Sequence, residues 1–148
     1  LYTYWCRTFL HPSLAAFDAS PREECVVERV RSNTPQQALV LLNDPTYVEA
    51  ARAFAEQILA RGGQSIRDKI AFAYRQSLSR PPTQEESKLL SALFADHLKQ
   101  YTDDEQAAAD LLKTGLRESD GMAWKAELAA WTSIARVLFN LHEFITRQ

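Results

Sequence analysis

The sequence has few glycines and no long apolar run, and both absences restrict what the chain can do. Only 4 of its 148 residues are glycine, so it has no glycine-rich phosphate-binding loop, and the G-x-S-x-G nucleophile motif is also missing. No apolar stretch approaches the ~18 residues that a membrane-spanning helix needs. The net charge of −2 lacks the basic excess typical of nucleic-acid-binding domains. We therefore expect no membrane span in this chain and no nucleic-acid partner.

Cysteine is also scarce. The two cysteines, Cys6 and Cys25, have neither the C-x-x-C spacing of a redox pair nor the C-x-x-C-H motif of haem attachment. A disulfide between them remains open in an oxidising compartment. A chain of this length can bury a core that needs no such covalent link, so we favour two buried thiols.

The sequence predicts no metal site, no cofactor and no catalytic residue. Its three histidines, His11, His97 and His142, lie far apart, and no pair has the i, i+4 spacing of a helical zinc site. Adjacent carboxylates occur mainly where helices are expected to begin, and there they stabilise the helix dipole. We therefore expect no catalysis by this chain alone.

Motifs that begin helices recur from Thr34 onward. Each is a side chain that can accept hydrogen bonds from the first turn, often followed by Pro at the first helical position or by Gln or Glu three residues later. The predicted starts are Thr34, Asp44, Ser65, Thr83 and either Asp103 or Asp104. At the first of these we expect Gln37 to bond back to the backbone of Thr34. The predicted ends are Gly62-Gly63, residues 80–82 and Gly115.

Apolar residues repeat at helical spacing within these segments. The run 38–42 is apolar on all sides, so we expect the short helix that contains it to be buried. Ile66 begins the apolar face of a later helix, and Asn140 with Glu143 predicts a capped final turn. A sixth helix has an apolar stripe that we interpret as core: Trp124, Leu128, Trp131, Ala135 and Leu138. The sequence thus predicts an all-α fold, an irregular bundle of five to seven helices in one domain over residues 1–148.

Residues 1–33 form an irregular N-terminal segment before the helical body at 34–148. We expect a short helix within residues 1–9, breaks at Pro12 and Pro21, and a partly extended stretch at 25–30. The first five residues are already rich in apolar groups, so we expect the chain to be part of a larger protein.

One polar cluster in this segment is the candidate ligand-binding site: Asp18, Arg22, Arg29 and Arg31. Irregular segments held by a scaffold often carry function. The structural alternative, which we favour, is that the guanidinium groups bind Asp18, Asp44 or the carbonyl ends of helices.

Four stretches of the sequence resemble a domain family of unknown function that is abundant in planctomycetes and related bacteria. They are residues 1–5, residues 17–19, residues 25–45 with Ser32-Asn33-Thr34-Pro35-Gln36-Gln37-Ala38-Leu39, and the closing segment 131–144. The resemblance implies that this chain is the last portion of the C-terminal domain of a large exported protein. It also implies a periplasmic or cell-envelope location and upstream partner domains, one of them cytochrome-c-like. No catalytic residue is carried over from the family.

Two functional hypotheses follow. The first is a non-catalytic helical scaffold or interaction module that packs against upstream domains of the same polypeptide. The alternative is a contribution to a carbohydrate-binding or redox site shared with those domains, with Asp18, Arg29 and Arg31 as its polar members.

Overall fold

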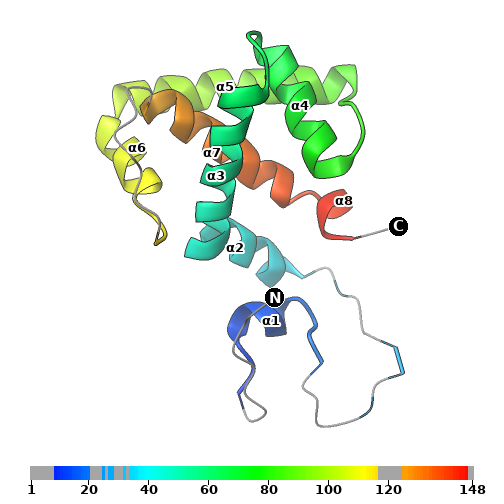
Figure 1. The fold of residues 1–148 in the computed structure, drawn as a ribbon. Helices are drawn as coiled ribbons and strands as arrows, with labels where there is room; N and C mark the ends of the chain where they lie inside the picture. Colours follow the sequence, from blue (N-terminus) through cyan, green and yellow to red (C-terminus); the bar gives the residue numbers. More distant parts are fainter. Residues whose placement is uncertain are drawn as a thin grey trace.

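The computed structural model describes residues 9–20, 25, 27–28, 32, 34–116 and 125–146. Within these ranges it contains eight α-helices and no strand, which confirms the predicted all-α fold (Figure 1). The helices are α1 (Pro12–Ala16), α2 (Pro35–Asn43), α3 (Pro45–Arg61), α4 (Ile66–Leu78), α5 (Gln84–Asp103), α6 (Glu105–Leu112), α7 (Lys125–Phe139) and α8 (His142–Ile145).

Most of the predicted helix starts are confirmed by hydrogen bonds. Asp44 accepts from the Thr46 amide at the start of α3, and Ser65 accepts from the Asp68 amide at the start of α4. Thr83 and Glu86 form a complete capping box at α5. Asp104 caps α6 by accepting from the Ala107 amide. These interactions satisfy amides that the first turn of a helix otherwise leaves without a partner.

Helix α7 forms the centre of the bundle. Nine of its residues are buried, and Figure 1 shows α3, α5 and α6 arranged around it. Trp131 is completely buried, and its ring packs on Phe94 of α5 with 4.6 Å between the ring centroids. The prediction that Trp131 belongs to the core is confirmed, while Trp124 lies outside the described residues. Because α7 touches the other long helices, residues far apart in sequence share one core.

The predicted break at Pro12 is confirmed, because His11 before it has a non-helical backbone with a ψ of 134°. This proline also begins helix α1, which the sequence did not predict. Proline fits the first helical position, where an amide would have no intrahelical acceptor. The imidazole Nδ1 of His11 accepts a hydrogen bond from the Ser13 amide at 3.3 Å. Helix α1 is held against the start of α3 by a 3.0 Å hydrogen bond from Ser13 Oγ to Asp44 Oδ2. The predicted short helix over residues 1–9 lies almost entirely outside the described residues.

Helix α2 is not buried as predicted. Only Gln37 and Leu41 are buried, and Leu39 is 58% exposed. The helix packs with one side against α1, α3 and α7, and no described element covers the other side. Ile66 of α4, which was expected on an apolar face, is likewise 42% exposed, because the core-facing residues of that helix begin only at Ile70.

The predicted cap at the C-terminal turn is also wrong. Helix α8 starts after Leu141, whose side chain cannot cap, and Asn140 instead donates to the carbonyl of Ala38 at 3.4 Å. Glu143 binds Arg80. Both side chains therefore have partners distant in sequence, which a local motif does not reveal.

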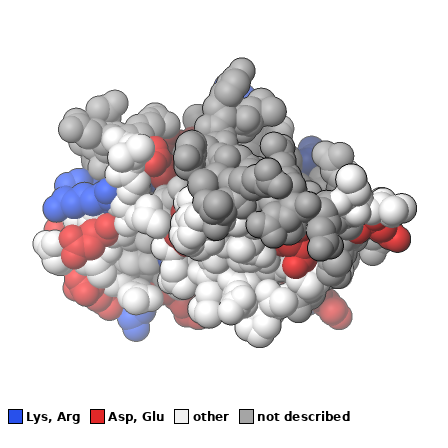
Figure 2. Space-filling model, turned by 90° about the horizontal axis from the view of Figure 1, so that it is seen from below, with Lys and Arg blue, Asp and Glu red and all other residues white. Residues whose placement is uncertain are grey.

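Among the described residues on the face seen in Figure 2, no large area carries one charge. Basic and acidic side chains are interspersed there with uncharged residues. Among the residues that the structure describes, no helix is both long and apolar enough to cross a membrane.

Candidate functional site

Asp18 is the only member of the predicted polar cluster that lies within the described residues. Its backbone has a φ of +54°, in the left-handed region that Asp tolerates better than most residues. Its Oδ2 atom accepts hydrogen bonds from the backbone amide of Ser32 at 2.8 Å and from the Ser32 hydroxyl at 2.6 Å. The carboxylate thus holds the chain after α1 to the residues that precede α2. The other three members, Arg22, Arg29 and Arg31, lie outside the described residues.

Gln37 completes this connection from the first turn of α2. Its side chain is 3% exposed, and its Nε2 donates to the Ser32 carbonyl at 3.0 Å and to Asp18 Oδ2 at 3.5 Å. The expected bond from Gln37 back to the Thr34 backbone is therefore absent, and the Thr34 side chain makes no capping bond either. Only the NH₂ group of this amide is satisfied, because Gln37 Oε1 is buried without a hydrogen-bond partner.

Asp44 lies beside this connection and joins α1 to α3. Burial acts to raise the pKa of its carboxyl, but hydrogen bonds from Thr46 and Ser13 outweigh burial and lower the pKa. The ionised form is therefore favoured, which suits both the helix cap and the Ser13 contact.

Cys25 is exposed and carries a free thiol, so its predicted burial is wrong. It lies in the segment between α1 and α2. Cys6 lies outside the described residues.

Two arginines that the sequence did not single out bind the carbonyl ends of helices. Arg52 of α3 is 1% exposed and donates to the carbonyl of Leu112, the last residue of α6. Arg136 of α7 donates to the carbonyl of Leu42 near the end of α2. The last carbonyls of a helix have no intrahelical donor, and a guanidinium group satisfies them. This is the role that the sequence predicted for the N-terminal arginines, and other arginines fulfil it here.

A third arginine, Arg80, joins three elements through carboxylates. It pairs with Glu86 in α5 and with Glu143 in α8, each at 2.8 Å, and its guanidinium lies 5.3 Å from the ring centroid of Tyr74. Hydrogen bonds from Arg80 lower the pKa of Glu86 from its ordinary 4.5 to about 2 and also lower the pKa of Glu143. Hydrogen bonds from the two carboxylates raise the pKa of Arg80. All three groups therefore stay charged at neutral pH.

The histidines serve local structure. His11 accepts a bond at α1, the imidazole of His97 stacks on Tyr101 with 6.0 Å between ring centroids, and His142 lies beside the Thr146 hydroxyl. In the part of the chain that the structure describes, no group of three or more histidine, cysteine or acidic side chains is placed to hold a metal ion.

A polar cleft of about 780 Å³ lies where α4 and α5 both begin. Arg67 and Asp68 line it from α4, and Ser87 and Lys88 line it from α5. The two sides of this cleft are about twenty residues apart in sequence, so no local pattern indicates that they meet.

Comparison with known families gives one finding. A family model described as PSD1, protein of unknown function (DUF1553), matches residues 1–94, well over half of the chain. No curated protein and no solved structure matches.

Proposed function

The chain belongs to the PSD1 family of proteins of unknown function (DUF1553), and we propose that within this family it acts as a non-catalytic helical scaffold or interaction module. Its partners are other domains of a larger polypeptide, one of them cytochrome-c-like. We also propose that this polypeptide is exported and works in the periplasm or cell envelope. The partners and the location rest on the sequence resemblance alone.

The scaffold proposal rests on one observation: charged side chains connect helices to one another. Arg52 and Arg136 bind the carbonyl ends of α6 and α2, and Arg80 joins the start of α5 to α8. Asp18 binds the backbone before α2. Each of these residues connects two segments that are separated in the sequence. Charged groups that hold helices together favour a structural scaffold over a catalytic site.

The surface that docks on the partner domains is the N-terminal arm, which we define as the described residues between Phe9 and Asn43. Three large apolar side chains are exposed there: Phe9 at 69%, Val27 at 106% and Leu39 at 58%. Exposed apolar groups that gather on one part of a molecule often mark interaction sites. Figure 1 shows α1 and α2 at one end of the molecule, where a further domain can approach without disturbing the bundle around α7.

A binding experiment with two leucine variants tests this proposal. The chain is titrated with the separately produced upstream part of the full-length polypeptide, and the dissociation constant is measured by calorimetry. Replacing Leu39 with Asp places a charge in the proposed interface, so we expect affinity to fall by a factor of about ten or more. The control is Leu89→Asp, since Leu89 is similarly exposed at 66% but lies on α5, away from the arm.

Thermal unfolding of both variants separates binding from folding. Both leucines are exposed, so we expect wild-type unfolding temperatures for both variants. Equal affinities for the wild type and the Leu39 variant would disprove docking through the arm. No binding by the wild-type chain would contradict the interaction-module proposal as a whole.

A further inference from the structure

The cleft between α4 and α5 has a size and composition suited to a small ligand. Its volume of about 780 Å³ falls within the range of roughly 300–1,000 Å³ common for small-molecule sites. Pro81 and Pro82, in the loop that joins the two helices, provide an apolar wall. The lining also includes hydroxyl groups and two cations, Arg67 and Lys88.

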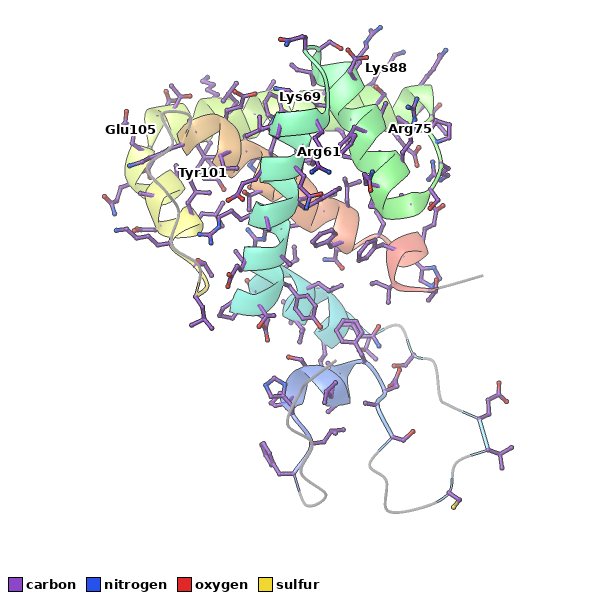
Figure 3. The ribbon with its side chains drawn as sticks, viewed as in Figure 1. Arg61, Lys69, Arg75, Lys88, Tyr101 and Glu105 are labelled. Carbon is purple, nitrogen blue, oxygen red and sulfur yellow. The ribbon has the colours of Figure 1, made fainter. Side chains whose placement is uncertain are left out.

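The cations of the cleft come from different helices. Arg67 lies in the first turn of α4 and Lys88 in the second turn of α5, and both are exposed. Figure 3 shows Lys88 at the end of the molecule where α4 begins. Among the described residues neither cation takes part in an ion pair, whereas Lys69 and Arg80 do. Both cations line one opening, and Arg and Lys are the side chains that bind carboxylate and phosphate groups.

One carboxylate also lines the cleft, and it offsets one of the two positive charges. Asp68 accepts a 2.6 Å hydrogen bond from the Ser65 hydroxyl at the N-terminal cap of α4. The lining therefore keeps one net positive charge. Glu85 and Glu86 lie in the first turn of α5 but do not line the cleft, and Glu86 is paired with Arg80.

The hydroxyl groups of Ser87 and Ser91 add uncharged hydrogen-bonding groups to the lining of the cleft. Ser91 Oγ donates to the carbonyl of Ser87 at 2.6 Å, so its oxygen still accepts hydrogen bonds from the cleft. The hydroxyl of Ser87 lines the same side as Lys88. A ligand with its own hydroxyl groups can exchange hydrogen bonds with these serines while its carbon skeleton lies against the two prolines.

We propose that this cleft binds a sugar that carries one oxyanion group, with Arg67 and Lys88 as the cations that attract the anion. The shared chemistry is a carboxylate or sulfate on a hydroxylated ring. This inference is independent of the docking role, because α4 and the start of α5 lie at the opposite end of the molecule from α2 (Figure 1). The failure of either proposal therefore leaves the other intact.

The experiment titrates the full chain with glucuronate and with glucose 6-sulfate, followed by backbone amide NMR. Glucose and acetate are the controls for the ring and for the anion alone. We expect saturable shifts of amides within residues 66–71 and 82–91 with at least one of the two anionic sugars, and much weaker binding of both controls. The sugar that binds identifies the anion.

Four charge-neutralising variants assign the binding to the cleft. Arg67→Gln and Lys88→Gln each remove one charged hydrogen-bond donor, so we expect affinity to fall by about tenfold or more. Arg75→Gln on α4 and Lys99→Gln on α5 are matched controls, because both residues are exposed and neither lines the cleft. We expect these two variants to bind as the wild type does.

Several results would overturn the proposal. They are the absence of saturable binding by either anionic sugar, equal binding of glucose, and equal binding of acetate. An equal loss of affinity in all four variants would show general charge attraction without a defined site. Normal affinity in both the Arg67 and the Lys88 variants would place any binding elsewhere on the chain.

Discussion

Arg52 shows how one residue can contradict its expected place in the fold. It lies in α3 among small apolar residues, and its side chain is 1% exposed although arginine is usually found at the surface. The guanidinium reaches the carbonyl of Leu112, sixty residues further along the chain. Burial of this cation is tolerated because the end of α6 supplies an acceptor that has no donor within its own helix.

Replacing Arg52 tests this interpretation. We expect Arg52→Leu to lower the free energy of unfolding by about 2–3 kcal/mol, because the buried Leu112 carbonyl loses a charged hydrogen-bond donor. The measurement is urea unfolding followed by circular dichroism. Arg61→Leu is the control, since Arg61 lies at the exposed end of the same helix. We expect it to change stability by no more than about 0.5 kcal/mol. Equal losses in the two variants would refute a special role for Arg52.

Asp18 belongs to the polar site predicted from the sequence, and that prediction stays open because its three arginines lie outside the described residues. Within the described residues, its carboxylate accepts from the amide and hydroxyl of Ser32. The left-handed backbone at Asp18 brings these groups together. Sequence spacing does not reveal such a turn, because Asp is compatible with several backbone conformations.

At the scale of single helices, α2 and α5 begin with similar motifs and are held differently. Thr83 and Glu86 form both bonds of the capping box at α5, with Thr83 N to Glu86 Oε2 at 2.7 Å. At α2 the Thr34 side chain makes no capping bond, and Gln37 binds Ser32 instead. At the start of α5, Glu86 accepts from the Thr83 amide and from Arg80 together, so the ion pair leaves the capping box intact. The start of α2 packs against the preceding segment, and that segment takes the glutamine.

This difference predicts unequal effects of the same substitution at the two caps. We expect Thr83→Ala to cost about 1 kcal/mol of unfolding free energy, a typical loss for a helix cap. Thr34→Ala should cost no more than about 0.5 kcal/mol, because no side-chain bond is lost. Thermal unfolding of both variants checks this. A larger loss at Thr34 than at Thr83 would contradict the observed hydrogen bonds.

At the scale of the whole molecule, the packing of α7 and the Arg80 cluster hold the ends of the bundle together. Arg80 follows α4, Glu86 belongs to α5, and Glu143 belongs to α8. Phe144 of α8 also stacks on Phe139 of α7, with 4.9 Å between the ring centroids. The C-terminal turn is therefore held by the Arg80–Glu143 ion pair and by aromatic packing. Acid should weaken the ion pairs of Arg80 by protonating their carboxylates.

Stability should therefore depend on acid pH through Glu86. The pKa of Glu86 is about 2 in the folded protein and 4.5 ordinarily, so the unfolded chain binds its proton at a higher pH than the folded chain does. The stabilisation is present above pH 4.5 and is lost as the pH falls toward 2. We expect this part of the loss to be on the order of 1 kcal/mol, because the pair is partly exposed to solvent.

Urea unfolding at a series of acidic pH values measures this dependence. Glu86→Gln removes the titrating group while Gln can still form the capping box, so the variant should lose less stability between pH 4.5 and 2 than the wild type does. The matched control is Glu85→Gln, whose exposed side chain lies in the same turn. This control should keep the wild-type profile. An unchanged profile in the Glu86 variant would show that the acid dependence arises elsewhere.

The helix starts at Asp44, Ser65, Thr83 and Asp104 were predictable from the sequence because each depends on groups within three residues of one another. The apolar spacing of Leu128, Trp131, Ala135 and Leu138 likewise predicted the buried face of α7, since the helical repeat places these residues on one side. The all-α fold follows from these local patterns. No partner from another part of the chain is needed to produce them.

Only the tertiary structure decided which polar groups meet over long distances. The bonds from Arg52 to Leu112 and from Arg80 to Glu143 join residues about sixty positions apart, and the cleft arises from the way α4 and α5 pack. The exposure of Leu39 has the same origin, because α2 covers only one of its sides with other helices. The physical reason is range: caps and periodicity act within one or two turns, while buried charges and clefts depend on the relative positions of whole helices.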